Sequence, residues 1–294
     1  MKELLKNKKL VIAICVAVVL AIGIAIWAIV GGGGSGESHG KSTADVLNLM
    51  EKSKAAYENV SSVHGVMNMD MQMSIEDMEM NLTVQMGVYR NKSGDIQKTE
   101  NIVTLGGFGS QATTSYIDEK NNIVYTTDDG GSSWSKEKIS ADEAELYMQS
   151  ADFSQLLTEI RNYKEVGPET VNGIAAMRYD GAIESDKLGE LMDQTGLLDS
   201  LGTEEMTDKQ KQELKKKIGD ITVSLWIDPN TDLPQKLSID MTNMMKSILE
   251  ISEAADSAAT AAAEAVSKVT MVYTNSEYNS LAPIELPSEA KSAK

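Results

Sequence analysis

The soft sulfur chemistry of this chain is concentrated in one short stretch. Residues 66–86 hold seven of the 17 methionines, and His64 comes just before them. Thioether sulfurs are soft ligands that suit Cu(I), and imidazole is a common metal ligand. A copper-handling site is therefore one hypothesis for this stretch.

The spacing of these methionines favours a different interpretation. Apolar residues take every second position: Met67, Met69, Met71 and Met73, and then, after a change of parity, Met78, Met80, Leu82, Val84 and Met86. Leucine and valine continue the series without a break, so these positions require apolar volume rather than sulfur. Methionine is a flexible side chain that adapts to irregular partners. We therefore interpret the series as the apolar lining of a sheet, and His64 as a strand-edge residue.

A single antiparallel hairpin would place the whole series on one face, because side chains alternate between the faces of a strand. We expect a four-residue loop at 74–77, which sets Met73 opposite Met78, Met71 opposite Met80, Met69 opposite Leu82 and Met67 opposite Val84. Gln72 then faces the other side of the sheet.

The remaining reactive side chains form no convincing catalytic set. Residues 42–294 contain no cysteine and only one histidine, whereas general-base, nucleophilic and zinc chemistry mostly draws on these residue types. The acidic segments 128–130 and 228–232 offer oxygens to calcium, but turns require the same residue types, so we favour turns. We expect no enzymatic activity and no cofactor. The formal net charge of −17 excludes nucleic acid as an expected partner.

The N-terminal segment predicts a membrane anchor. Residues 1–9 contain four lysines, residues 10–30 carry no charge over the length of a membrane-spanning helix, and residues 31–41 form a glycine-rich linker. The lysines should stay cytoplasmic, which places a domain at 42–294 outside the cell membrane on a single-pass anchor. A cleaved signal peptide and acylation of Cys15 are the less favoured alternatives.

Residues 42–294 alternate between strand and helix patterns. Helices are predicted at 42–59, 141–160, 185–194, 203–218 and 244–267, and about eleven strands, the last at 268–278, fill most of the rest. Leu225, Ile239 and Met271 lie on the apolar sides of three C-terminal strands. Hairpins predominate, so the pattern predicts an α+β fold in which helices cover one face of an antiparallel sheet.

Four segments, taken in order, add a family resemblance. They are IVYTTDDGGSSWSKEKI, NYKEVGPETVNGIAAMRYDGAI, LWIDPNTDLPQKLSIDM and IELPSEA, and the most specific part joins Trp226-Ile227-Asp228 to Leu233-Pro234 across a turn. This order resembles the LolA/LppX-like lipoprotein-carrier superfamily, above all its uncharacterised Gram-positive members, which are membrane-anchored or lipoproteins. The resemblance covers about residues 42–290. It implies a curved antiparallel half-barrel with helices packed on the concave face and a hydrophobic cavity for acyl chains between them.

We therefore predict non-enzymatic binding of lipid or lipoprotein acyl chains, with the cell membrane as a second partner through the N-terminal helix. The expected cavity lining consists of Met67, Met69, Met71, Met73, Met78, Met80, Leu82, Val84, Met86, Leu225, Ile239 and Met271. The alternative is an envelope sensor or protein-interaction module with the same fold. A copper-handling protein is the third and least favoured hypothesis.

Overall fold

The computed structural model describes residues 44–75, 78–106, 109–140, 157, 160–185, 208–251 and 263–293. The predicted segments at 1–9, 10–30 and 31–41 lie outside the described residues, as do most of the predicted helices at 141–160 and 185–194. Among the described residues, no helix has both the length and the apolar character needed to cross a membrane.

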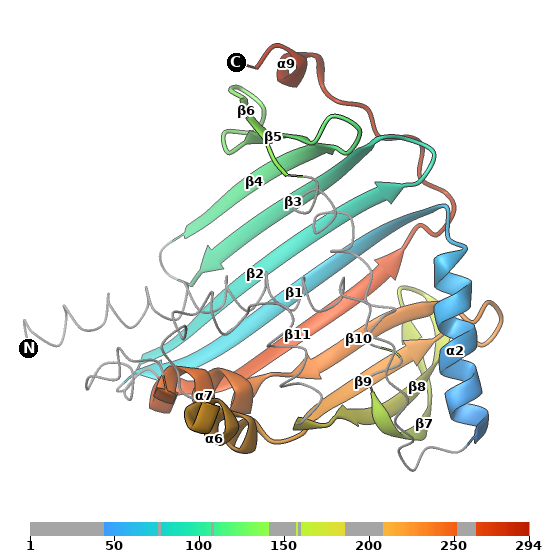
Figure 1. Ribbon diagram of the computed structural model, residues 1–294, viewed down its shortest axis with the longest axis vertical. Coiled ribbons are helices and arrows are strands. Elements are labelled where there is room, and N and C mark those ends of the chain that lie inside the picture. The colour runs from blue at the N-terminus through green and yellow to red at the C-terminus, as the bar shows by residue number, and fades with distance from the viewer. Residues whose placement is uncertain are drawn as a thin grey trace, which may run out of the picture.

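Eleven strands form one open sheet, as the strand pattern predicts (Figure 1). The order across the sheet is β6-β5-β4-β3-β2-β1-β11-β10-β9-β8-β7, and all neighbouring strands pair antiparallel. The strands are β1 (Ser62–Ile75), β2 (Met78–Asn91), β3 (Ile96–Leu105), β4 (Gly109–Asp118), β5 (Ile123–Thr127), β6 (Ser135–Lys138), β7 (Arg161–Val171), β8 (Ile174–Ile183), β9 (Ile221–Ile227), β10 (Pro234–Asp240) and β11 (Val266–Ser276).

Short turns join β1 to β6 into a meander. In the other half, short turns join β7 to β8 and β9 to β10, whereas longer segments that include α6 and α7 join β8 to β9 and β10 to β11. The pairing of β1 with β11 joins the two halves. The connection between β7 and β8 shows why the turns form where they do. Asn172 and Gly173 both have positive φ angles, 49° and 81°, which a tight two-residue hairpin requires and which Asn-Gly supplies at little cost. This predicted hairpin is confirmed.

The methionine hairpin of β1 and β2 is shifted by two residues from the predicted register. Only residues 76 and 77 separate the strands. Met73 lies opposite Met80, Met71 opposite Leu82, Met69 opposite Val84 and Met67 opposite Met86. The predicted four-residue loop is therefore wrong, because Ser74 and Ile75 continue the strand and pair with Glu79 and Met78. A shift of two residues preserves side-chain parity, so the apolar series still shares one face.

The described helices are α2 (Ala44–Glu58), α6 (Asp208–Ile218), α7 (Thr242–Ile251) and the short α9 (Ser288–Lys291). The first two agree with the helices predicted at 42–59 and 203–218. The helix predicted at 244–267 extends too far, because Val266 and Ser267 already belong to β11. Val266 pairs with Met73 of β1, and a β-branched residue of this kind favours the strand.

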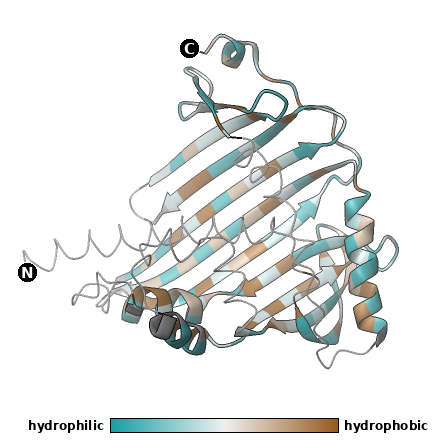
Figure 2. Ribbon diagram, in the orientation of Figure 1, coloured by the Kyte–Doolittle hydropathy of each residue, from teal (hydrophilic) through white to brown (hydrophobic). Residues whose placement is uncertain are grey.

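One face of the sheet carries the hydrophobic core, and we call it the inner face. Along β1 and β2, apolar and polar residues alternate between the two faces, as the banded colouring in Figure 2 shows. The inner-face residues form one cluster with Met50 of α2, Leu214 of α6 and Met245 of α7. In addition, α6 packs against α7, and α7 packs against β11. The prediction that helices cover the apolar face of the sheet is confirmed for these three helices.

The opposite, outer face is held together around Trp226 of β9, which is only 4% exposed. The Arg178 guanidinium from β8 lies 5.2 Å from the indole centroid, and the Lys236 ammonium from β10 lies 4.2 Å from it. The indole N–H donates to Glu169 Oε2 on β7 at 2.8 Å. This bond, together with the hydrogen bond from Arg178, lowers the pKa of the Glu169 carboxyl. One tryptophan thus links four neighbouring strands.

Candidate functional site: the inner face and its two ends

The methionine series becomes a continuous apolar surface where β2, β1 and β11 lie side by side. Met69 of β1 stands opposite Val84 on one neighbour and Met271 on the other. Met67 stands between Met86 and Tyr273 in the same way. The surface is therefore built from three strands, one of which comes from the far end of the chain.

Most of the predicted lining residues meet in this one cluster. Ten of the twelve are at most 9% exposed and belong to it: Met67, Met69, Met71, Met73, Met80, Leu82, Val84, Leu225, Ile239 and Met271. Met86 is partly buried and packs against the cluster. Met78 begins β2, and its side chain lies outside the described part of the structure.

The helical side of the same interface is also rich in methionine, which the sequence pattern of the strands did not reveal. Met50 of α2, Met244 and Met245 of α7, and Met241 just before α7 are each at most 2% exposed. Ten of the chain's 17 methionines therefore belong to one cluster. The i, i+1, i+4, i+5 spacing of Met244, Met245, Ile248 and Leu249 is the signal that could have identified them, because it marks a buried helix stripe.

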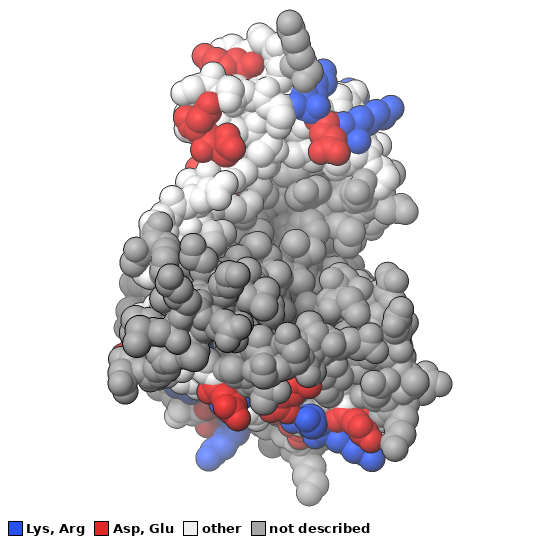
Figure 3. Space-filling model, turned by 90° about the vertical axis from the view of Figure 1, so that its left-hand side faces the viewer, with Lys and Arg blue, Asp and Glu red and all other residues white. Residues whose placement is uncertain are grey.

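The inner face is a poorly solvated environment. Tyr273, which lies beside Met67, is 3% exposed, and burial raises the pKa of its hydroxyl above the ordinary range. In the view of Figure 3, charged side chains are visible at the top and at the bottom of the molecule. The inner face is therefore suited to apolar ligands rather than to ions.

His64 does not join the methionines. It lies on the outer face of β1, a central strand, so its predicted position at a strand edge is wrong. Its ring stacks on that of Tyr89 with centroids 4.0 Å apart, and its Nδ1 lies 3.5 Å from Glu277 Oε1. Within the described residues, no group of three or more His, Cys, Asp and Glu side chains is arranged to hold a metal.

The acidic segments behave as turns. Asp129 accepts hydrogen bonds from the hydroxyl and backbone N–H of Ser133 and from the Thr127 hydroxyl, and these bonds lower the pKa of its carboxyl to about 2. Asp228 likewise accepts from the backbone and side-chain N–H groups of Asn230 and from the Thr231 hydroxyl. Their oxygens already satisfy the donors of their own turns, which favours the turn interpretation over calcium binding.

A cavity of about 410 Å³ lies at the end of the inner face where α6 ends and α7 begins. Three of its lining residues, Ile218, Ile221 and Met244, also belong to the core cluster. Its polar rim consists of Asp220, Thr222, Asp240, Thr242, Asn243, Ser267 and Lys268. The cavity therefore connects a polar edge with the apolar interior.

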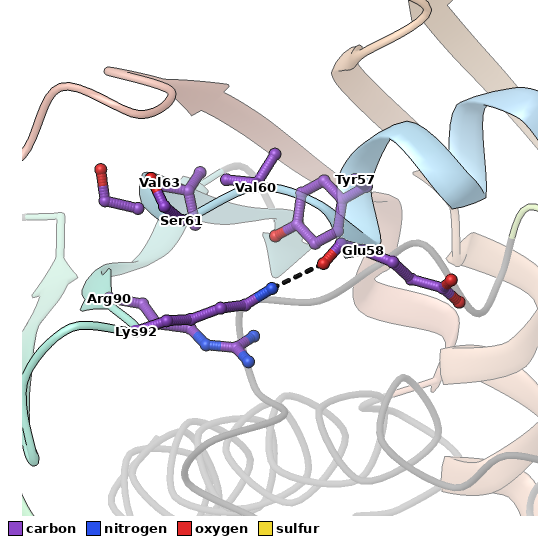
Figure 4. A pocket seen from close by; sticks show the side chains of 8 residues that line it. Tyr57, Glu58, Val60, Ser61, Val63, Arg90 and Lys92 are labelled. Atoms are coloured by element: carbon purple, nitrogen blue, oxygen red, sulfur yellow. Dashed lines mark hydrogen bonds between the residues drawn. The ribbon is translucent and has the colours of Figure 1, made fainter.

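A second cavity, of about 170 Å³, lies at the opposite end of β1 and β2, below the end of α2 (Figure 4). Tyr57, Val60 and Val63 supply apolar walls, and Arg90 and Lys92 supply two positive charges. Neither cation was among the predicted site residues, although Arg90 continues the alternating series of β2 after Met86 and Val88.

The fold and the site define an α+β protein with an open antiparallel sheet, one face of which is apolar and covered by helices. The chain belongs to the family of unknown function DUF6612, whose sequence model matches residues 45–294. No curated protein matches the chain.

Three solved structures are similar to it at low identity. Lipoprotein LppX from Mycobacterium tuberculosis is 14% identical, with 83% of this chain and 100% of that chain covered and a TM-score of 0.44. LprF from Mycobacterium bovis is 15% identical, with coverage of 84% and 98% and a TM-score of 0.47. A putative outer membrane lipoprotein-sorting protein domain from Vibrio parahaemolyticus is 12% identical, with coverage of 66% and 70% and a TM-score of 0.22.

Proposed function

We propose that this protein binds acyl chains of lipids or lipoproteins, without enzymatic activity, between the inner face of its sheet and the helices that cover it. The observation that carries the proposal is the presence of methionine on both sides of this interface. Met69, Met71 and Met271 project from the sheet, and Met50 and Met245 approach from α2 and α7. Leucine, isoleucine and valine specify a fixed core better, whereas methionine adapts to partners of varying shape.

Binding would be driven by removal of apolar surface from water, at about 0.8 kcal/mol for each methylene buried. A chain of ten methylenes would therefore gain about 8 kcal/mol, before the cost of moving the helices is subtracted. The cavity beside α6 and α7 extends this apolar space at one end of the inner face, because its walls run from a polar rim to Met244 in the core.

We further propose an extracytoplasmic location, with residues 10–30 as a single-pass membrane anchor and residues 31–41 as a linker. The chain would then be a membrane-anchored member of the LolA/LppX-like superfamily from a Gram-positive envelope. The uncharged run at 10–30 and the lysines before it support this topology.

One observation favours a second function. Met69, Met71 and Met271 are each at most 1% exposed, so the helices can also be understood as a permanent cover. In that case the protein is an envelope sensor or interaction module with a closed core. Copper handling stays a third hypothesis, although His64 lies on the outer face and not beside the methionines.

Photo-cross-linking of the full chain distinguishes the first two functions. The chain is solubilised in dodecyl maltoside with a diacylglycerol that carries a photoactivatable group in one acyl chain. We expect saturable labelling of peptides from β1, β2, β11 and α7, and competition by unlabelled diacylglycerol. Labelling confined to residues 10–30 would show that the inner face is closed to acyl chains and would contradict the proposal.

A further inference from the structure

The cavity at the Arg90 end of the inner face contains the chemistry of an anion site. We propose that Arg90 and Lys92 bind a phosphate group, and that this phosphate is the head group of a lipid whose acyl chain lies on the methionine surface. This proposal rests on the proposed function, because the acyl chain places the head group.

The first support is the position of Arg90 in the strand. It has the same parity as Val84, Met86 and Val88, and it stands opposite Val63, a buried inner-face residue of β1. Arg90 comes four positions after Met86, which corresponds to about 13 Å along a strand. An extended acyl chain on the methionines therefore points its polar end toward this guanidinium.

The second support is the environment of one guanidinium nitrogen of Arg90. Its Nε is buried, and no hydrogen-bond partner for it exists among the described residues. Glu119 is the nearby carboxylate whose pKa the charge of Arg90 lowers, against a larger rise caused by burial. Within the described part of the chain, Glu119 and Arg90 do not form an ion pair. A buried guanidinium donor without an acceptor is unfavourable, and an oxyanion would satisfy it.

The third support is the convergence of a second cation on the same cavity. Lys92 Nζ donates to the backbone oxygen of Glu58 at 2.7 Å, which holds the ammonium beside the cavity. Figure 4 shows the side chains of Arg90 and Lys92 directed to the same side, while the carboxylate of Glu58 points away from both. The lining therefore combines two positive charges with one acidic side chain that is turned outward.

Size and charge together select phosphate. A cavity of about 170 Å³ holds on the order of ten waters, which is ample for a phosphate ester. A guanidinium can bind two phosphate oxygens at once, and the ammonium supplies a second point charge. In a chain with a net charge of −17, long-range attraction of anions is absent, so local cations of this kind are needed to hold one.

The test compares two photoactivatable lipids that have identical acyl chains: phosphatidylglycerol and diacylglycerol. In the wild-type full chain in dodecyl maltoside, we expect phosphatidylglycerol to label at a concentration about tenfold or more below that of diacylglycerol. Arg90→Gln should raise the half-labelling concentration of phosphatidylglycerol about 10- to 100-fold, as expected for loss of charge-assisted hydrogen bonds. Labelling by diacylglycerol should not change.

Three further variants complete the comparison. Arg90→Lys keeps the charge but loses the bidentate geometry, so it should retain part of the preference. Lys92→Gln should reduce the preference as well, and it stands in for Arg90→Gln if melting curves show that the latter does not fold. Lys120→Gln removes an exposed lysine elsewhere and should leave both lipids unaffected.

Equal labelling by the two lipids in the wild type would overturn the head-group site while the proposed function stands. Labelling of the inner face by neither lipid would overturn the proposed function. If labelling shows no preference for phosphatidylglycerol, melting curves with inorganic phosphate test whether the cavity binds free phosphate. A melting temperature that rises with phosphate in the wild type but not in Arg90→Gln assigns the cavity to free phosphate. If no such rise occurs, phosphate binding by Arg90 and Lys92 is refuted altogether.

Discussion

Met71→Asp is expected to lower the free energy of unfolding by several kcal/mol or to prevent folding, because it places a carboxylate where water is excluded. Met71 is 1% exposed in the centre of the methionine surface, opposite Leu82 on β2 and Val269 on β11. Neither neighbour can pair with a charge. Urea denaturation of the full chain, followed by tryptophan fluorescence, measures the loss.

Two matched variants control for this prediction. Gln72→Asp introduces the same carboxylate one residue further on, where the side chain is exposed on the outer face, and should change stability by less than about 0.5 kcal/mol. Met71→Leu keeps apolar volume and should cost less than about 1.5 kcal/mol. Equal stability of the Met71→Asp and Gln72→Asp variants would show that the assigned faces of β1 are wrong.

Trp226→Ala is expected to cost about 3–5 kcal/mol, the usual range for deleting a buried aromatic side chain. The indole is enclosed by Arg178 and Lys236 and donates to Glu169, so its loss leaves a cavity and separates these charges. Melting curves of the full chain, analysed together with urea denaturation, measure the effect.

Trp134→Ala is the appropriate comparison for Trp226→Ala. Trp134 lies just before β6 at the sheet edge, is only partly buried, and donates to the backbone oxygen of Gly131. Its removal should cost clearly less. If the two substitutions destabilise the chain equally, the outer-face contacts of Trp226 do not hold β7 to β10 together.

The face of each residue could be predicted from the sequence, because it depends on local alternation. Met67, Met71 and Leu82 share the inner face, as their period of two requires. The register could not be fixed in this way. Pairing Met71 with Leu82 instead of Met80 moves the hairpin by two residues and leaves the parity of both strands unchanged. The choice depended on whether Ser74 and Ile75 belonged to the loop or to the strand.

The remaining parts of the site depend on contacts between distant segments. The pairing of Met69 with Met271 joins residues about 200 positions apart, and neither local sequence contains a signal for it. Arg90 differs from this pair, because its position in the alternating series of β2 can be read from the sequence. The role that we propose for it depends on the structure, which places α2, the start of β1 and the end of β2 around one cavity.

Native mass spectrometry of the full chain, released from dodecyl maltoside after purification from its own membrane, tests the central claim most directly. We expect a population whose mass exceeds that of the polypeptide by one lipid, and solvent extraction should recover an acyl-chain lipid in near-stoichiometric amount. Phosphate-containing lipids should predominate in the extract. A chain that carries no lipid after mild purification, and that takes up none when lipid is added, would contradict acyl-chain binding at the inner face.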